Sequence, residues 1–144
     1  MTEEFYIYLS SKDSVKTFPT NSASDFSVLL PERIQLQPPE TWSCGLVKLI
    51  IPTAPTDPVF LCSNFSQSSI VGEHRLPTLG RIVNTHSDPS HVIYVPIRGS
   101  ELDIIRLYIT GYDGQKVSLA SGTTYCTLHF IQNHHESPSS NHQS

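Results

Sequence analysis

The segment "LASGTTYCTLHF" (residues 119–130) decides the fold, because a turn at Ser121-Gly122 leads into a strand with alternating side chains. One face of this strand is mainly apolar and the other mainly polar: Thr124, Cys126, Leu128 and Phe130 against Tyr125, Thr127, His129 and Ile131. A period of two is typical of a β-strand with one face in a core. We therefore expect this segment to be the last strand of an all-β scaffold.

The same period recurs along the chain. Further predicted strands are residues 4–10, 25–31, 41–52, 58–64 and 91–97, and residues 101–119 are predicted to form a hairpin around Asp113-Gly114. The first segment, "EFYIYLS", alternates as regularly as the last. Residues 67–85 are less regular, and we expect two short strands there, or one strand and a helical turn.

For two of the predicted strands, the sequence also indicates where the strand ends or which side chains share a face. Residues 25–31 end at Pro31, which cannot donate a hydrogen bond to a central ladder. In residues 41–52, simple alternation places Leu46 and Lys48 on one face and Val47 and Leu49 on the other. Both faces of this strand are largely apolar beyond Gly45, which is typical of a strand covered on both sides.

These segments predict an all-β, antiparallel sandwich of about eight strands with no long helix. A single jelly roll or another Greek-key order is the commonest arrangement for this number of strands. At 144 residues the chain is expected to form one domain, residues 1–133. Residues 134–144, "HHESPSSNHQS", contain no apolar residue and are expected to be a disordered tail.

Composition argues against several classes of function. The formal net charge is −4 and the nine Lys and Arg residues are scattered, so no basic stripe for nucleic acid is visible. No apolar run is long enough to cross a membrane, and the acidic N-terminus does not resemble a secretory signal. Cys44, Cys62 and Cys126 lack CxxC spacing, which favours a reducing compartment over a disulfide framework.

Enzymatic and metal-dependent functions find little support in the sequence. Cys126 and His129 are three residues apart on an alternating strand, so their side chains point to opposite faces and cannot form a catalytic pair. We expect Cys126 to be a buried thiol and His129 to be exposed or to contact a partner. The seven histidines do not show the spacing of a zinc site. The expectation is therefore no catalytic residues, no metal and no cofactor.

The order of these segments resembles the penton (minor capsid) proteins of Polinton/Maverick elements, adintoviruses and adomaviruses. The resemblance runs from residue 5 to residue 130. The residues that match the family's motifs or its turns are Phe18, Pro19, Asn21, Phe26, Trp42, Gly45, Leu46, Pro52, Gly72, Gly114, Gly122, Leu128 and Phe130. Two departures from the family are Lys48, where relatives are often acidic, and "IQNHH" after Phe130, where they are usually basic.

The resemblance implies a structural protein of a DNA virus, a single jelly roll that forms homopentamers at the five-fold vertices of an icosahedral virion. Its partners would be copies of itself and a double-jelly-roll major capsid protein, with a host receptor or a fibre-like protein as a further candidate. Assembly would occur in the host nucleus or cytoplasm. Outward-facing tyrosines are the candidate interface residues: Tyr6, Tyr8, Tyr108 and Tyr125. The alternative is a lectin- or cytokine-like sandwich that binds a ligand or receptor without a capsid role.

Overall fold

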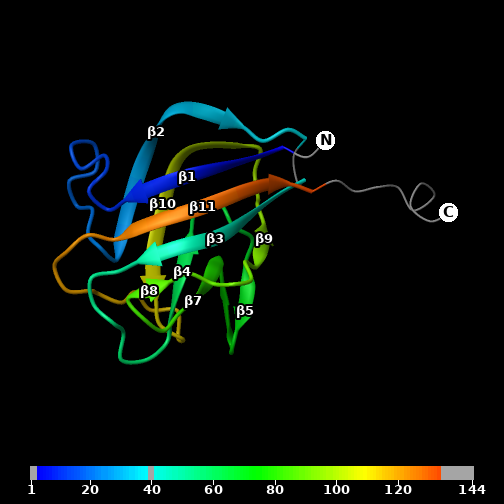
Figure 1. Ribbon diagram of the computed structural model, residues 1–144. Coiled ribbons are helices and arrows are strands. Elements are labelled where there is room, and N and C mark those ends of the chain that lie inside the picture. The colour runs from blue at the N-terminus through cyan, green and yellow to red at the C-terminus, as the bar shows by residue number, and fades with distance from the viewer. Residues whose placement is uncertain (1–2, 39–40, 134–144) are drawn as a thin grey trace.

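The computed structural model describes residues 3–38 and 41–133 as two facing antiparallel β-sheets (Figure 1). The strands are β1 (Glu4–Ser10), β2 (Asp25–Gln35), β3 (Trp42–Ile50), β4 (Val59–Ser63), β5 (Ser69–Val71), β6 (His74–Leu76), β7 (Thr78–Ile82), β8 (His86–Ser87), β9 (Tyr94–Pro96), β10 (Glu101–Thr110) and β11 (Tyr125–Gln132). The described part of the chain contains no helix, so the prediction of an all-β, antiparallel sandwich is confirmed there. The tail predicted at residues 134–144 lies outside the described residues.

The first sheet has the strand order β1-β11-β3, with β8 and β9 both pairing the far edge of β3. The second sheet has the order β2-β10-β4-β7, and β5 and β6 form a separate two-stranded hairpin. Because β8 and β9 are two pieces of one interrupted edge, each main sheet has four strand positions. About eight strands were expected, and the higher count of eleven comes from this interruption and from the short hairpin. No helix in the described residues could span a membrane.

The strand β11 lies in the middle of the first sheet, between β1 and β3 (Figure 1). Cys126, Leu128 and Phe130 are buried in the core, as the alternation predicts. The opposite face carries the exposed Tyr125. The register is continuous against β1, where Ser10 is the Cα partner of Tyr125 and Phe5 that of Phe130.

The prediction of which β3 side chains share a face is wrong beyond Leu46. The ladder with β11 skips Val47, because Leu128 pairs with Leu46 while Thr127 pairs with Lys48. This bulge inserts one residue and reverses the alternation, so that Lys48 is exposed and Leu49 returns to the core. The bulge is defined by the pairing of β3 with β11, which lies far away in the sequence.

The predicted end of the second strand at Pro31 is also wrong, since β2 continues to Gln35. Two structural features accommodate the proline. β2 is an edge strand, where a missing backbone donor is tolerated, and the register with β10 is interrupted between Leu29 and Ile34. Pro31 lies within this irregular stretch and is exposed.

The second half of the chain forms shorter strands than the sequence suggests. Residues 67–85 contain three strands, β5, β6 and β7, and no helical turn. The strand predicted at residues 91–97 is reduced to β9, and the predicted hairpin after β10 has only a single bridge, between Thr110 and Lys116, in its second arm. The Asp113-Gly114 turn is present, with Gly114 at φ +82°.

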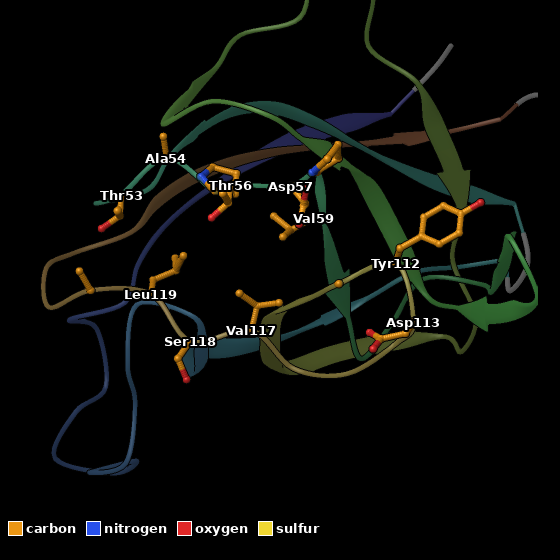
Figure 2. Close-up of a pocket in the computed structure, with 14 residues that line it drawn as sticks. Thr53, Ala54, Thr56, Asp57, Val59, Tyr112, Asp113, Val117, Ser118 and Leu119 are labelled. Atoms are coloured by element: carbon orange, nitrogen blue, oxygen red, sulfur yellow. The ribbon is translucent and has the colours of Figure 1, made fainter.

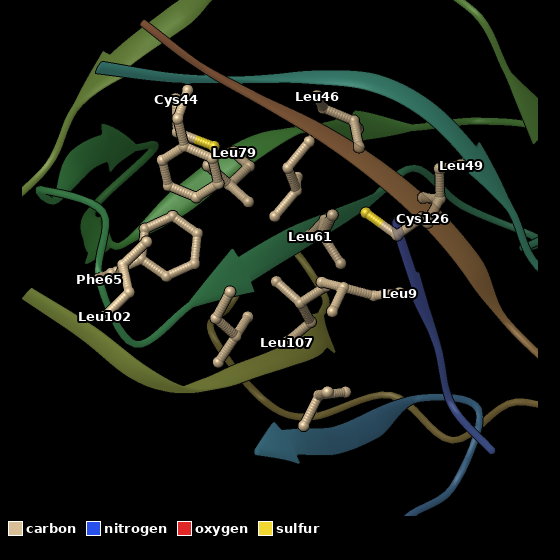
Figure 3. Close-up of a cluster of buried hydrophobic side chains, with 14 of the residues drawn as sticks. Leu9, Cys44, Leu46, Leu49, Leu61, Phe65, Leu79, Leu102, Leu107 and Cys126 are labelled. Carbon is tan, nitrogen blue, oxygen red and sulfur yellow. The ribbon is translucent and has the colours of Figure 1, made fainter. Parts of the chain in front are cut away.

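The core lies between the two sheets and is built from the inward faces of both (Figure 3). The Phe130 ring contacts residues from different parts of the chain: it is stacked on the Phe5 ring at 5.0 Å and lies tilted to the Phe65 ring at 5.5 Å. Cys44 and Cys126 belong to this core as free thiols. A second, smaller cluster of Phe60, Cys62, Val71 and Leu76 lies between the second sheet and the β5–β6 hairpin.

The motif residues of the loop before β2 are not fully buried, and Asn21 stabilises this loop by side-chain hydrogen bonds. Phe18 is half-buried and Pro19 is exposed. The Asn21 side-chain amide donates to the carbonyl of Ser27 at 2.8 Å and to that of Asp13 at 3.2 Å. It also accepts from the Ser27 amide at 2.9 Å. Asn21 therefore fastens the loop to the first residues of β2.

The remaining motif residues divide between the core and tight turns. Phe26, Trp42, Leu46, Leu128 and Phe130 are all buried in the main core. Gly72 adopts φ +61° beneath the ring of Tyr112, where a Cβ would lie 2.6 Å from a ring carbon. Gly122 adopts φ +151° against Pro52, whose Cβ would be 2.6 Å away. These two glycines fit where a side chain would collide.

A cluster of charged side chains on the outer face of the second sheet makes the stability of the fold depend on pH. Burial of Asp25 opposes ionisation, but hydrogen bonds and positive charge from Arg106 and Lys116 outweigh it and hold the pKa of Asp25 below its usual range. A lowered pKa stabilises the fold above the unfolded value near 3.8, and this stabilisation is lost as the pH falls through the folded value.

We expect Asp25→Asn to lower the free energy of unfolding by about 1 kcal/mol at pH 7, because the cluster is partly solvent-exposed. The difference from the wild type should shrink as the pH falls below about 4. Urea denaturation between pH 7 and pH 2 checks this, with the exposed Asp103→Asn as the control. A difference that stays constant over that range would contradict the assignment.

Candidate functional site

The outward face of the first sheet carries three of the four tyrosines predicted as interface residues. Tyr6 and Tyr8 lie on β1 and Tyr125 lies on the neighbouring β11. All three are exposed, Tyr8 most of all at 73%. The rings of Tyr6 and Tyr8 are 6.5 Å apart and nearly parallel. These three side chains form an exposed aromatic surface on the outside of the first sheet. We call Tyr6, Tyr8 and Tyr125 the tyrosine surface.

The fourth predicted residue, Tyr108, is not part of this surface. It lies on β10 in the opposite sheet, half-buried against the smaller apolar cluster. The Arg106 guanidinium lies over its ring at 4.6 Å from the centroid. Period-two alternation identifies Tyr108 as outward-facing, but it does not reveal which sheet the strand joins.

His129 lies under the tyrosine surface and is buried within the chain itself, whereas the prediction was that it is exposed or contacts a partner. Its Nε2 is 2.5 Å from Glu4 Oε1 and its Nδ1 is 2.7 Å from the Tyr94 hydroxyl. The Tyr6 ring stacks on the imidazole at 4.4 Å, and the whole residue is only 6% exposed. Three elements, β1, β9 and β11, are thereby joined through one imidazole.

Gly45 makes this arrangement sterically possible. It is the Cα partner of both His129 on β11 and Tyr94 on β9, so it lies between them in the ladder. A Cβ at Gly45 would be 2.4 Å from a methyl carbon of Val92 and 2.8 Å from the Tyr94 ring. The absence of a side chain lets Tyr94 cross β3 and reach His129. The motif glycine therefore has a specific packing role.

The protonation pattern of the group follows from its partners. Burial, followed by the nearby Tyr6, Glu4 and Cys44, raises the pKa of Tyr94, so its hydroxyl keeps its proton. An ionised Glu4 can only accept. An imidazole tautomer with its proton on Nε2 satisfies all three groups: Nε2–H donates to Glu4, and Nδ1 accepts from Tyr94.

We expect Tyr94→Phe to lower the free energy of unfolding by about 1–2 kcal/mol, because His129 Nδ1 is left buried without a donor. Urea denaturation measures the loss. Tyr112→Phe is the matched control, since Tyr112 is 62% exposed. Equal stability of the two variants would show that the Tyr94–His129 hydrogen bond contributes nothing.

The cysteines are packed in the core, as predicted for Cys126. Burial raises the pKa of the Cys44, Cys62 and Cys126 thiols, which lowers their reactivity as nucleophiles. Cys126 faces the core while His129 lies on the outer face, so the two do not meet. Within residues 3–38 and 41–133, no three His, Cys, Asp or Glu side chains come together as a metal site would require.

A cavity of about 650 Å³ lies at one end of the sandwich, between the loop at residues 53–58 and the segment at residues 111–120 (Figure 2). Val117 and Leu119 form part of its wall, and Asp57 and Asp113 supply carboxylates. The sequence pattern does not indicate this site. Its walls come from two loops that are far apart in the sequence, so no local motif marks it.

Comparisons with known proteins leave the family open. No family model matches the chain, and no curated protein matches it significantly. The resemblance to penton proteins therefore stays a prediction that rests on the motif residues alone.

Proposed function

We propose that the sandwich is a single jelly roll and that the chain is a penton protein, a homopentamer at the five-fold vertices of a viral capsid. In this role it contacts copies of itself laterally and a double-jelly-roll major capsid protein at its base. The virion is its proposed location. The function is then assembly, carried by surfaces and not by a reaction.

The observation that carries the proposal is the order of strands in the two sheets. Along the chain, β1, β3 and β11 enter the first sheet while β2, β4 and β10 enter the second. The first strand pairs with the last, and the second pairs with the next to last. This pairing of the first strand with the last and of the second with the next to last supports the proposal of a jelly roll, a fold that is common among viral capsid domains.

The surface of the first sheet also supports assembly. The tyrosine surface combines exposed aromatic rings with polar hydroxyl groups. Tyrosine is among the residues enriched in protein–protein contacts. His129 fixes Tyr6 from below through ring stacking. An anchored aromatic side chain loses less conformational freedom on binding than a mobile one.

A second candidate function is supported by the cavity between residues 53–58 and 111–120. Its volume of about 650 Å³ lies in the range of small-molecule sites, and jelly rolls also occur in lectins. A ligand-binding module would use this loop end in place of lateral contacts between copies.

Co-expression of the full chain with a major capsid protein tests the two candidates. The penton proposal expects electron microscopy to show the chain at five-fold vertices, with shells assembled from the major capsid protein alone as the control. Closed shells whose vertices lack the chain would contradict it. Saturable binding of a sugar or other small ligand to a monomer would favour the second candidate.

A further inference from the structure

The strand β1 leaves one edge of the first sheet open (Figure 1). Within residues 3–38 and 41–133, β1 pairs only with β11, and the ladder between them runs without a bulge. A regular, exposed edge strand is a template for a further strand, and folded proteins usually protect such edges with Lys, Pro, a bulge or a covering loop. The sequence of β1, "EFYIYLS", contains neither Lys nor Pro.

Hydrogen bonds at the two ends of β1 show which of its backbone groups face outward. The Glu3 carbonyl accepts from β11 at 2.9 Å, and the Ser11 amide donates to the carbonyl of Thr124, the residue before β11, at 2.9 Å. Because the bonded residues alternate along an antiparallel strand, the odd-numbered residues of β1 face β11. The N–H and C=O groups of Tyr6 and Tyr8 therefore point to the open edge.

The other described edge strands are protected or short. On β2, the Ser27 amide donates to the Asn21 side chain at 2.9 Å. The Leu29 amide donates to the Ser14 hydroxyl at 3.0 Å, and Pro31 has no backbone donor. The edge strands β7, β8 and β9 have five residues or fewer. Among the described edges, β1 is therefore the one best suited to accept another strand.

A groove with a volume of about 440 Å³ lies beside this edge, between β1 and β2. The apolar parts of its wall include Ile7, Val28, Leu30 and Ile34. Among the described residues that line it, the charged ones are Asp13 and Glu32, and no Lys or Arg lies among them. Both carboxylates are exposed. We call this the acidic groove, since its wall is largely apolar and its charge is negative.

We propose that the open edge of β1 binds an extended segment of another protein, with apolar residues at alternate positions and Lys or Arg at both ends. The segment adds an antiparallel strand to the first sheet and bonds to the backbone of Tyr6 and Tyr8. Every second side chain then points towards the second sheet and fills the acidic groove. The basic ends complement Asp13 and Glu32. This inference goes beyond the proposed function, because the edge binds such a segment with or without a pentamer.

Charge argues against a second copy of the same edge as the occupant. Two β1 edges paired about a two-fold axis bring two acidic grooves together, and like charges at an interface are unfavourable. β1 itself carries Glu4 and no basic residue that could offset them. A segment with basic ends removes this repulsion and replaces it with attraction.

A synthetic heptapeptide, KVTVTVR, blocked at both ends, tests the backbone contact. We expect a peptide concentration of about ten times its Kd to slow the hydrogen exchange of the Tyr6 and Tyr8 amides about 10-fold, because peptide carbonyls then accept from them. The Phe5 and Ile7 amides face β11 and should not change. NMR of the deuterated full chain measures all four amides.

The same peptide, N-methylated at its two inner threonines, is the matched control for backbone pairing. In an added antiparallel strand these threonines share the outer face with Tyr6 and Tyr8, so their N–H groups point to β1. N-methylation removes these donors and keeps every side chain. We expect the affinity to fall at least about 10-fold.

Charge reversal in the groove tests the chemistry of the segment. We expect Glu32→Lys to weaken the binding of KVTVTVR by about 5- to 10-fold and to strengthen that of EVTVTVE. Glu73→Lys is the matched control, because Glu73 is exposed in the turn between β5 and β6, outside the groove. Isothermal titration calorimetry with both peptides measures the affinities.

The outcomes separate this inference from the proposed function. The inference is overturned if the basic peptide gives no saturable protection of Tyr6 and Tyr8, or if the N-methylated peptide or Glu32→Lys leaves the affinity unchanged. Slow exchange of these two amides without any peptide also overturns it, because a second copy or the chain itself then covers the edge. Selective protection together with the response to Glu32→Lys supports the inference. The penton role depends on none of these results and is tested by electron microscopy of assembled shells.

Discussion

We expect Phe130→Ala to lower the free energy of unfolding by about 3–5 kcal/mol, a large part of the stability of a domain this size. Phe130 is fully buried, and its ring contacts Phe5 on β1 and Phe65 beyond β4. Its removal leaves a cavity where side chains from both sheets meet. Because these neighbours are held by their own strands, the site can collapse only partly.

Urea denaturation followed by tryptophan fluorescence measures this loss, since Trp42 packs beside Phe5 in the same core. Tyr125→Ala is the matched control on the same strand, because Tyr125 points outward and is 53% exposed. We expect the control to stay within about 0.5–1 kcal/mol of the wild type. Similar losses for both variants would contradict the assignment of inward and outward faces on β11.

Gly45→Ala should have the second largest effect, a loss of about 2–3 kcal/mol. Its Cβ would lie 2.4 Å from a Val92 methyl carbon and 2.8 Å from the Tyr94 ring, so both side chains must move. Movement of Tyr94 also breaks its hydrogen bond to His129. We therefore expect β9 to separate from β3 more readily, in addition to the global loss.

Hydrogen exchange of the β9 amides, together with urea denaturation, measures both consequences. Gly80→Ala is the matched control, because the nearest atom to its added Cβ is a Leu46 methyl carbon at an ordinary 3.7 Å. The control should retain wild-type protection and stability. If Gly45→Ala behaved like Gly80→Ala, the proposed crossing of Tyr94 over Gly45 would be wrong.

Local patterning predicts the long strands of this fold well. β1, β3, β4, β10 and β11 lie close to where the hydrophobic pattern places them, and β1 and β11 each bury one continuous face against the other sheet. The signal weakens where a segment is short or at an edge. The residues from 67 to 97 form strands of two to five residues, which are too short to show a clear period.

The errors at Val47 and Pro31 have a common physical origin. Each depends on how a strand pairs with a neighbour far away in the sequence. The bulge at Val47 is defined only by its partner β11, and Pro31 is tolerated only because β2 is at an edge. A single sequence records neither the partner nor the edge.

The buried group around His129 shows the same limit for the candidate site. Alternation correctly placed His129 on the outer face, but its partners Glu4 and Tyr94 lie 125 and 35 residues away in the sequence. The one local signal was Gly45, whose missing side chain makes room for Tyr94. A glycine inside an otherwise apolar strand is therefore a useful indication of a close crossing.

The central claim is that five copies of this chain close into a ring. Native mass spectrometry of the full chain, both purified and released gently from assembled particles, tests it most directly. The proposal predicts a dominant species of about 80 kDa, five times the 16.1 kDa of one chain. A species of one chain only, from both sources and at all concentrations, would contradict it.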